Sequence, residues 1–116
     1  MKAAKTEENP APDLAEMMAK AGAASTFLKA IANENRLLML CLLARGEKSV
    51  SEIESTLGLR QPTVSQQLAR LRADDLVQAR RNGKAIHYSL ASEEVRRVMI
   101  ALDGLFQFCT PGTTAE

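Results

Sequence analysis

The 116-residue sequence has few aromatic side chains, a single histidine and two cysteines. Aromatics are 3% of the chain, which disfavours a surface that stacks single-stranded bases. The longest apolar run, Leu37 to Ala44, is too short for a membrane span, and the N-terminal MKAAKTEENPAP has no apolar stretch of signal-peptide length. We therefore expect a cytoplasmic protein with no membrane partner, whose cysteines stay reduced by default.

The sequence also lacks the usual groupings of metal ligands and phosphate-binding glycines. Cys41 and Cys109 form no CxxC unit, and with one distant histidine they do not fill a tetrahedral site within one chain. There is no glycine-rich phosphate loop and no internal repeat. We expect no metal and no cofactor, although a metal shared across a dimer remains open. A thiol enzyme would need a general base, and no histidine neighbours either cysteine in sequence, so we expect no enzyme.

The length predicts one domain over residues 13–110, between a flexible arm at 1–12 and a tail at 111–116. Helical spacing and caps predict a helix after Asp13, a second after Ser25, and a buried central helix around Cys41. A short helix follows a cap at Ser49 or Ser51 and ends at Gly58. A last helix, capped by Ser92, carries an apolar stripe that runs to Cys109 and stops at Pro111.

The segment QPTVSQQLARLR predicts an amphipathic helix that begins at Gln61 with Pro62 in its first turn. Val64, Leu68 and Leu71 share its apolar face. The other side chains are small, hydrogen-bonding or cationic: Thr63, Ser65, Gln66, Gln67, Ala69 and Arg70. Taken alone, such a face more often belongs to a helix that merely contacts solvent.

Two strand patterns, LVQARR and KAIHYSL, flank Asn82-Gly83, the strongest two-residue signal for a type I′ hairpin. That turn would pair Arg81 with Lys84 and would place His87 opposite Gln78. The positive charge of the chain is concentrated here, because residues 60–87 carry a net charge of +4 while the whole chain carries +1. The hairpin tip is therefore predicted to be basic.

Two short helices followed by a basic hairpin predict a mainly α fold with a small β-hairpin, a winged helix-turn-helix. A helix fits the major groove of DNA, where amides and hydroxyls read base edges, while cations meet phosphates. The predicted partner is double-stranded operator DNA, and the long apolar stripe of the last helix predicts a homodimer. The predicted DNA-binding residues are Gln61, Thr63, Ser65, Gln66, Gln67 and Arg70 on the helix, with Arg80, Arg81 and Lys84 as phosphate contacts.

Residues 33–90, from NENRLLML through LRQPTVSQQLARLR to the basic wing, resemble the ArsR-type winged-helix repressors. The resemblance implies a homodimeric repressor that leaves its operator when an inducer binds. Metal-sensing members carry the motif ELCVC where this chain has EKSVS, so Ser49 and Ser51 replace the thiolates. A neutral hydroxyl is a poor ligand for soft metals. The C-terminal helix has no histidine for the family's other metal site, and His87 is interpreted as a surface residue.

The two cysteines have two readings. Both lie on faces expected to turn inward, and a free cysteine commonly packs as a small apolar residue. Their positions also resemble those of the persulfide-responsive (SqrR and BigR type) branch of the family. That resemblance implies a Cys41/Cys109 dithiol that is bridged by sulfane-sulfur donors such as persulfides and derepresses sulfide-detoxifying genes. Metal-responsive and general redox-responsive repressors remain alternatives. A site spaced for polysulfide would exclude a direct disulfide, which needs Cα atoms about 4.4–6.8 Å apart.

Overall fold

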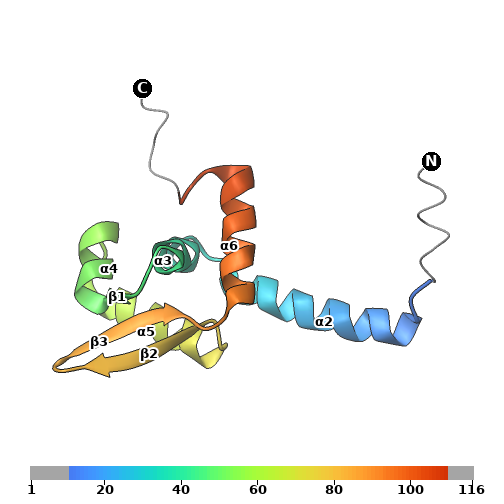
Figure 1. Cartoon of the computed structure of the whole chain (residues 1–116), viewed down its shortest axis with the longest axis horizontal. Helices are drawn as coiled ribbons and strands as arrows, with labels where there is room; N and C mark the ends of the chain where they lie inside the picture. The colour runs from blue at the N-terminus through green and yellow to red at the C-terminus, as the bar shows by residue number, and fades with distance from the viewer. Residues whose placement is uncertain (1–10, 110–116) are drawn as a thin grey trace.

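The computed structural model describes residues 11–109, so most of the predicted arm at 1–12 and the whole tail at 111–116 lie outside the described residues. The described chain is mainly helical with a small sheet, as the sequence predicts (Figure 1). Its elements, in chain order, are α2 Leu14–Ile31, α3 Glu34–Ala44, β1 Lys48–Ser49, α4 Val50–Leu57, α5 Gln61–Ala73, β2 Val77–Asn82, β3 Ala85–Leu90 and α6 Glu93–Phe106.

Helix α2 is a single helix that extends away from the other elements (Figure 1). The Asp13 side chain caps it by accepting from the Glu16 N–H at 3.2 Å. The helix continues through Ser25, so the prediction of a second helix start there is wrong. The surrounding AGAAS segment is rich in alanine, which favours helix enough to leave no break. Ala30 and Ile31, at its C-terminal end, are its only buried residues.

Helix α3 is the buried centre of the fold, as its apolar sequence predicts. Met39, Leu40 and Leu43 are fully buried, and the helix contacts α4, α5, α6 and β3. Asn33 caps it by accepting from the Arg36 N–H at 3.1 Å. Helices α4, α5 and α6 and strand β3 are thus placed against this helix.

Helices α4 and α5 form the predicted helix pair. Ser49 and Glu52 make a reciprocal capping box at the start of α4, and Gly58 ends that helix in the left-handed conformation with φ of 67°. In α5 the buried residues are Val64, Leu68 and Leu71, the three that the helical spacing predicts. The opposite face of α5 is thereby turned outward.

The sheet has three antiparallel strands in the order β1-β3-β2. The short strand β1 was not predicted, because two residues leave no periodic signal. The hairpin register differs from the prediction by two residues: Asn82 pairs with Ala85, and His87 lies opposite Arg80 instead of Gln78. The tight turn is Gly83-Lys84, since Gly83 has φ of 68° while Lys84 has no positive φ, the pattern of a type II′ turn. A shift of two residues preserves the face of every side chain.

Helix α6 ends before the predicted position. Gln107 caps it in the left-handed conformation, and its N–H donates to the Asp103 carbonyl. Cys109 therefore lies beyond the helix, not on its apolar stripe, and its N–H donates to Asp103 Oδ1 at 2.7 Å. None of the helices in residues 11–109 is both long and apolar enough to cross a membrane.

Candidate functional site

The outward face of α5 and the tip of the β2–β3 hairpin carry the residues that the sequence assigns to DNA. On α5, Gln61, Gln66 and Arg70 are exposed, while Thr63, Ser65 and Gln67 are half-buried. On the hairpin, Arg80, Arg81 and Lys84 are exposed. These nine side chains thus lie on two neighbouring elements, since α5 and β2 are in contact.

Several of the α5 side chains are already hydrogen-bonded to protein groups. Gln61 Nε2 donates to Ser65 Oγ at 2.5 Å, and Arg70 lies 3.8 Å from Asp74. The amide oxygen of Gln67 accepts from Arg36 Nη1 at 3.0 Å, which ties the recognition helix to α3. Within the described residues Gln66 and Thr63 have no such side-chain bond, so they are the side chains most available to an incoming partner.

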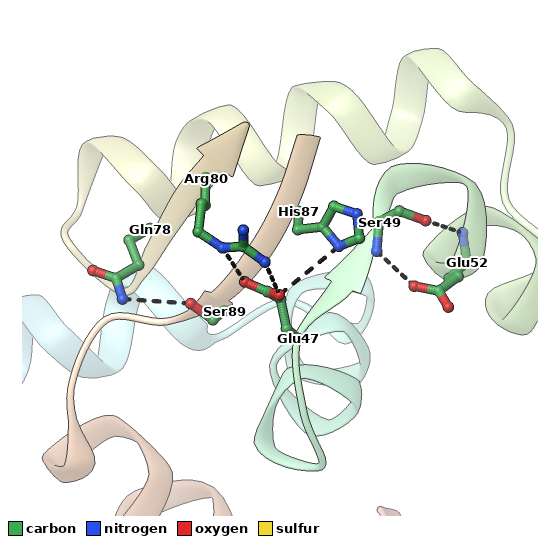
Figure 2. A network of polar contacts seen from close by, with 7 residues as sticks. All are labelled: Glu47, Ser49, Glu52, Gln78, Arg80, His87 and Ser89. Carbon is green, nitrogen blue, oxygen red and sulfur yellow. Dashed lines mark hydrogen bonds and ion pairs between the residues drawn. The ribbon is translucent and has the colours of Figure 1, made fainter. Parts of the chain in front are cut away.

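Arg80 is held by an acidic residue that sequence reasoning did not single out for this role. Its Nε and Nη2 atoms donate to the two carboxylate oxygens of Glu47 at 3.0 and 2.6 Å (Figure 2). Figure 2 also shows His87, whose Nδ1 lies 3.9 Å from the same carboxylate. Glu47 thereby joins the segment before β1 to both strands of the hairpin. Its 33-residue separation from Arg80 explains why spacing along the chain gave no signal.

The pKa values of this pair follow from the contact. Hydrogen bonds from Arg80 hold the pKa of Glu47 below its ordinary value, with a smaller lowering from the charges of Arg80 and His87. The same bonds raise the pKa of Arg80. The guanidinium of Arg80 is therefore bound to Glu47 and helps to hold the wing in place. Within the described residues, the Arg81 side chain donates only to the Gly83 carbonyl, at 3.4 Å.

Cys41 and Cys109 are joined as a disulfide with Cα atoms 5.3 Å apart. The distance lies inside the range for a direct disulfide. The expectation that spacing alone would exclude a direct disulfide is therefore wrong for this arrangement, because Cys109 follows the end of α6 and turns back toward α3. Cys41 is 4% exposed, and Cys109 is half-buried.

A cavity of about 280 Å³ adjoins the two sulfur-bearing residues. It is lined by Cys41, Ala44, Arg45, Met99, Ile100, Asp103 and Cys109. Arg45 and Asp103 bring opposite charges to this cavity, and its other lining residues are apolar or sulfur-bearing. Arg96 of α6 donates to the Ala44 carbonyl, so the end of α3 is fixed to α6 beside the same cavity.

Metal ligands do not gather within residues 11–109, where no group of three His, Cys, Asp or Glu side chains is placed to hold an ion. Ser49, which occupies a thiolate position of the metal-sensing motif, is engaged in the α4 capping box. His87 lies in the sheet beside Glu47, away from both cysteines in the chain and on a different element.

An outward helix face beside a basic wing, on a three-helix core, defines a winged helix-turn-helix regulator of DNA. Comparison with known proteins agrees: residues 33–79 match the family described as bacterial regulatory protein, arsR family. The chain is 43% identical to the biofilm growth-associated repressor of Agrobacterium fabrum over 98 residues, covering 84% of this chain and 82% of that protein.

Two solved structures give the same result. Reduced HlyU from Vibrio cholerae superposes with a TM-score of 0.75 at 43% identity, covering 78% of this chain and 96% of that one. The homodimeric winged helix-turn-helix DNA-binding domain Mb0332 from Mycobacterium bovis superposes with a TM-score of 0.70 at 34% identity, covering 78% and 84%. The chain belongs to the ArsR family of transcription regulators. The predicted family, the predicted winged-helix fold and the expectation of a regulator rather than an enzyme are confirmed.

The Glu47–Arg80 contact generates a prediction about the pH dependence of stability. Because the folded pKa of Glu47 lies below its ordinary value of 4.5, the contact stabilises the fold above that pH and is lost as the pH falls through the folded pKa. In a double-mutant cycle of Glu47→Gln, Arg80→Gln and the pair, measured by urea unfolding, we expect a favourable coupling at pH 7 that vanishes at low pH. A coupling that is the same at pH 7 and pH 3 contradicts this assignment.

Proposed function

We propose that this regulator is a homodimeric repressor whose affinity for operator DNA is set by the state of the Cys41/Cys109 pair. Sulfane-sulfur donors such as persulfides bridge the two cysteines, operator affinity falls, and sulfide-detoxification genes are derepressed. The observation that carries the proposal is the meeting of the two cysteines across α3 and the end of α6, with Cα atoms 5.3 Å apart. They are 68 positions apart in the chain, so the tertiary fold and not the local sequence brings them together.

The DNA-binding half of the proposal rests on the outer face of α5 and on the wing. Gln66 and Thr63 present amide and hydroxyl groups suited to base edges in the major groove, flanked by Ser65 and Gln67. Arg81 and Lys84 supply exposed charge for phosphates. The guanidinium of Arg80 is bound to Glu47, so we assign the phosphate contacts of the wing to Arg81 and Lys84 before Arg80.

The homodimer rests on apolar side chains that lie exposed in the single chain. On α2 these are Leu14, Met17, Met18 and Leu28, and on α6 they are Ile100, Leu105 and Phe106. Apolar surface of this extent is typical of a protein–protein interface. The homodimeric Mycobacterium bovis relative assembles with the same fold, and a dimer would bring two copies of α5 to one face of the duplex.

The sensing chemistry can be written with all atoms accounted for. A thiolate attacks the outer sulfur of a persulfide RSSH and the donor's S–S bond breaks. The RS⁻ group leaves and takes up a proton to become the thiol RSH, while the transferred sulfur makes the cysteine a persulfide. The second cysteine thiol then displaces hydrogen sulfide, and a disulfide forms. If both cysteines carry an extra sulfur, the same displacement leaves a trisulfide and releases hydrogen sulfide. The cavity beside the pair, with Arg45 in its wall, gives the donor a place to enter.

Helix α3 connects the cysteines to the DNA-binding surface. Cys41 lies near its C-terminal end, while Arg36 near its N-terminal end donates to Gln67 of the recognition helix. A bridge that shifts α3 against α6 therefore shifts a contact of α5 as well. A coupling of 1–3 kcal/mol, typical of allostery, changes operator affinity about 5- to 150-fold.

A general redox-responsive repressor is the alternative, in which an oxidant such as peroxide forms the direct disulfide that the Cα distance permits. A metal-responsive repressor is the weaker alternative, because the described residues gather no ligand set. Intact mass after separate treatment with a persulfide donor, peroxide and zinc distinguishes these cases.

The first prediction concerns assembly. Sedimentation of the reduced protein at micromolar concentration should give a dimer, since the exposed apolar faces of α2 and α6 need a partner. Half-sites in the operator should lie about 10 to 10.5 base pairs apart, one turn of DNA. A double change of Leu105→Asp and Phe106→Ser should shift the protein toward monomer, while the matched change Arg97→Ser on α6 should not. A monomeric wild type would refute the proposed assembly.

The second prediction concerns sequence readout, using an operator selected by the wild type from a random duplex library. Gln66→Ala should cost about 1–3 kcal/mol on that operator and much less on random duplex. Arg81→Gln and Lys84→Gln should weaken both duplexes and flatten the salt dependence. Equal losses on both duplexes for Gln66→Ala would show that Gln66 does not read bases.

The third prediction concerns the thiols. A persulfide donor should convert the reduced wild type to a form that has lost two thiol hydrogens, with or without added sulfur, and should weaken operator binding 5- to 150-fold by the coupling above. Cys41→Ser and Cys109→Ser should each bind the operator and ignore the donor. Peroxide run in parallel tells the persulfide-selective case from the general redox case. If either single variant still leaves DNA on treatment, the bridge is not the switch.

A further inference from the structure

Arg36 is a buried cation without an acidic partner. Its side chain is 92% buried, since the residue is only 8% exposed. Nε donates to the Ala30 carbonyl at 2.7 Å, near the C-terminal end of α2, and Nη1 donates to Gln67 Oε1 at 3.0 Å. Among residues 11–109 no carboxylate lies within ion-pair distance of this guanidinium. Nη2 has no acceptor there and reaches solvent, since these residues hold no buried side-chain nitrogen without a partner.

The two hydrogen bonds explain only part of this arrangement. The Ala30 carbonyl carries part of the negative end of the α2 dipole, which offsets a fraction of the charge. Burying a cation without a full counter-charge is nevertheless unfavourable, so buried arginines are normally paired with a carboxylate or phosphate. A capping role alone would be served by a neutral donor.

The guanidinium of Arg36 forms part of the wall of an open cavity of about 460 Å³. The other lining residues are Gln66, Gln67, Ala69 and Arg70, all on the recognition helix. Arg70 adds a second cation, whose contact with Asp74 is long at 3.8 Å and largely exposed. The cavity therefore combines two guanidinium groups and two amides, and it holds no carboxylate in its lining.

These groups are donors suited to a phosphate oxygen. The Nη2 of Arg36, which Ala30 and Gln67 leave unbound, and the guanidinium of Arg70 are charged donors for phosphate, and the amide nitrogens of glutamine add neutral donors. The cavity borders Gln66, which the proposed function places against base edges, so a duplex seated on α5 brings its backbone to this opening. The N-terminal end of α3, capped by Asn33, adds a favourable potential for an anion nearby, while exposed Glu34 in the same turn opposes it.

We propose that Arg36, with Arg70, binds a backbone phosphate of duplex DNA in the cavity between α3 and the recognition helix. The proposal rests on the proposed function, because it requires that α5 meets a duplex. In the bound state the phosphate supplies the counter-charge that the free protein lacks, and Arg36 joins three groups: the end of α2, Gln67 and the DNA backbone.

The test is the salt dependence of duplex binding by the reduced, full-length protein on the selected operator and on a random duplex of equal length. Each phosphate contact contributes about 0.9 to the slope of log affinity against log salt. Arg36→Gln should lower that slope by about this amount for each chain on the duplex and should weaken both duplexes alike. Arg36→Lys keeps the charge and should retain most of the slope, and Arg97→Gln, a matched loss of an exposed cation on α6, should leave it unchanged.

A second measurement removes dependence on the fold of the neutral variant. A scan of operators with one methylphosphonate, which is an uncharged phosphate substitute, should find a position that weakens the wild type strongly and Arg36→Lys less. If Arg36→Gln lowers the melting temperature but leaves the slope unchanged, or if no scanned position separates wild type from Arg36→Lys, Arg36 is a structural cap only. If the wild type binds no duplex, the proposed function itself fails.

Discussion

The burial of α3 is the constraint on which the other elements depend. Its fully buried residues, such as Met39 and Leu40, each contribute about 1.5–3 kcal/mol by removal from water, and they contact elements on every side of the helix. Because the helix is packed along most of its length, a displacement at one of its ends is transmitted to the elements at the other end. Its N-terminal end bonds α2 and the recognition helix through Arg36, and its C-terminal end bonds α6 through the Ala44 carbonyl and Cys41.

Local signals in the sequence predicted the parts of the fold that are stabilised locally. The cap at Ser49, one of the two serines that the sequence offered, the stop at Gly58 and the buried face of α5 all depend on residues within a few positions of one another. The hairpin was predicted, but its register was not. Asn-Gly favours a turn whose two central residues are Asn82 and Gly83. Here Asn82 pairs with Ala85, so the central residues of the turn are Gly83 and Lys84, one position later in the chain.

The functional surface was predicted where it depends on exposure and was missed where it depends on distant contacts. The outward polar residues of α5 follow from helical spacing, but nothing local to Arg80 indicates that Glu47 will occupy its fork. Along the sequence Arg36 is simply the last polar residue before an apolar run, and only the tertiary arrangement makes it a buried cation beside Gln67. The end of α6 was missed for the same reason. Beyond the helix, the Cys109 N–H donates to the Asp103 side chain, and helical spacing does not reveal that contact.

The geometry of the thiol pair also limits how the proposed sensor can be selective. With Cα atoms 5.3 Å apart, a direct disulfide and a longer sulfur bridge are both compatible with small movements of the segment after α6, so spacing does not choose between oxidants. Access of the donor to the thiols is the remaining source of selectivity, since Cys41 is buried and borders a cavity with Arg45 and Asp103 in its wall. The cavity wall carries one cation, Arg45, and one carboxylate, Asp103, so its charge does not by itself favour anionic donors over neutral peroxide. In the proposed mechanism, selectivity for persulfide therefore depends on which donors the cavity admits to the buried Cys41 sulfur.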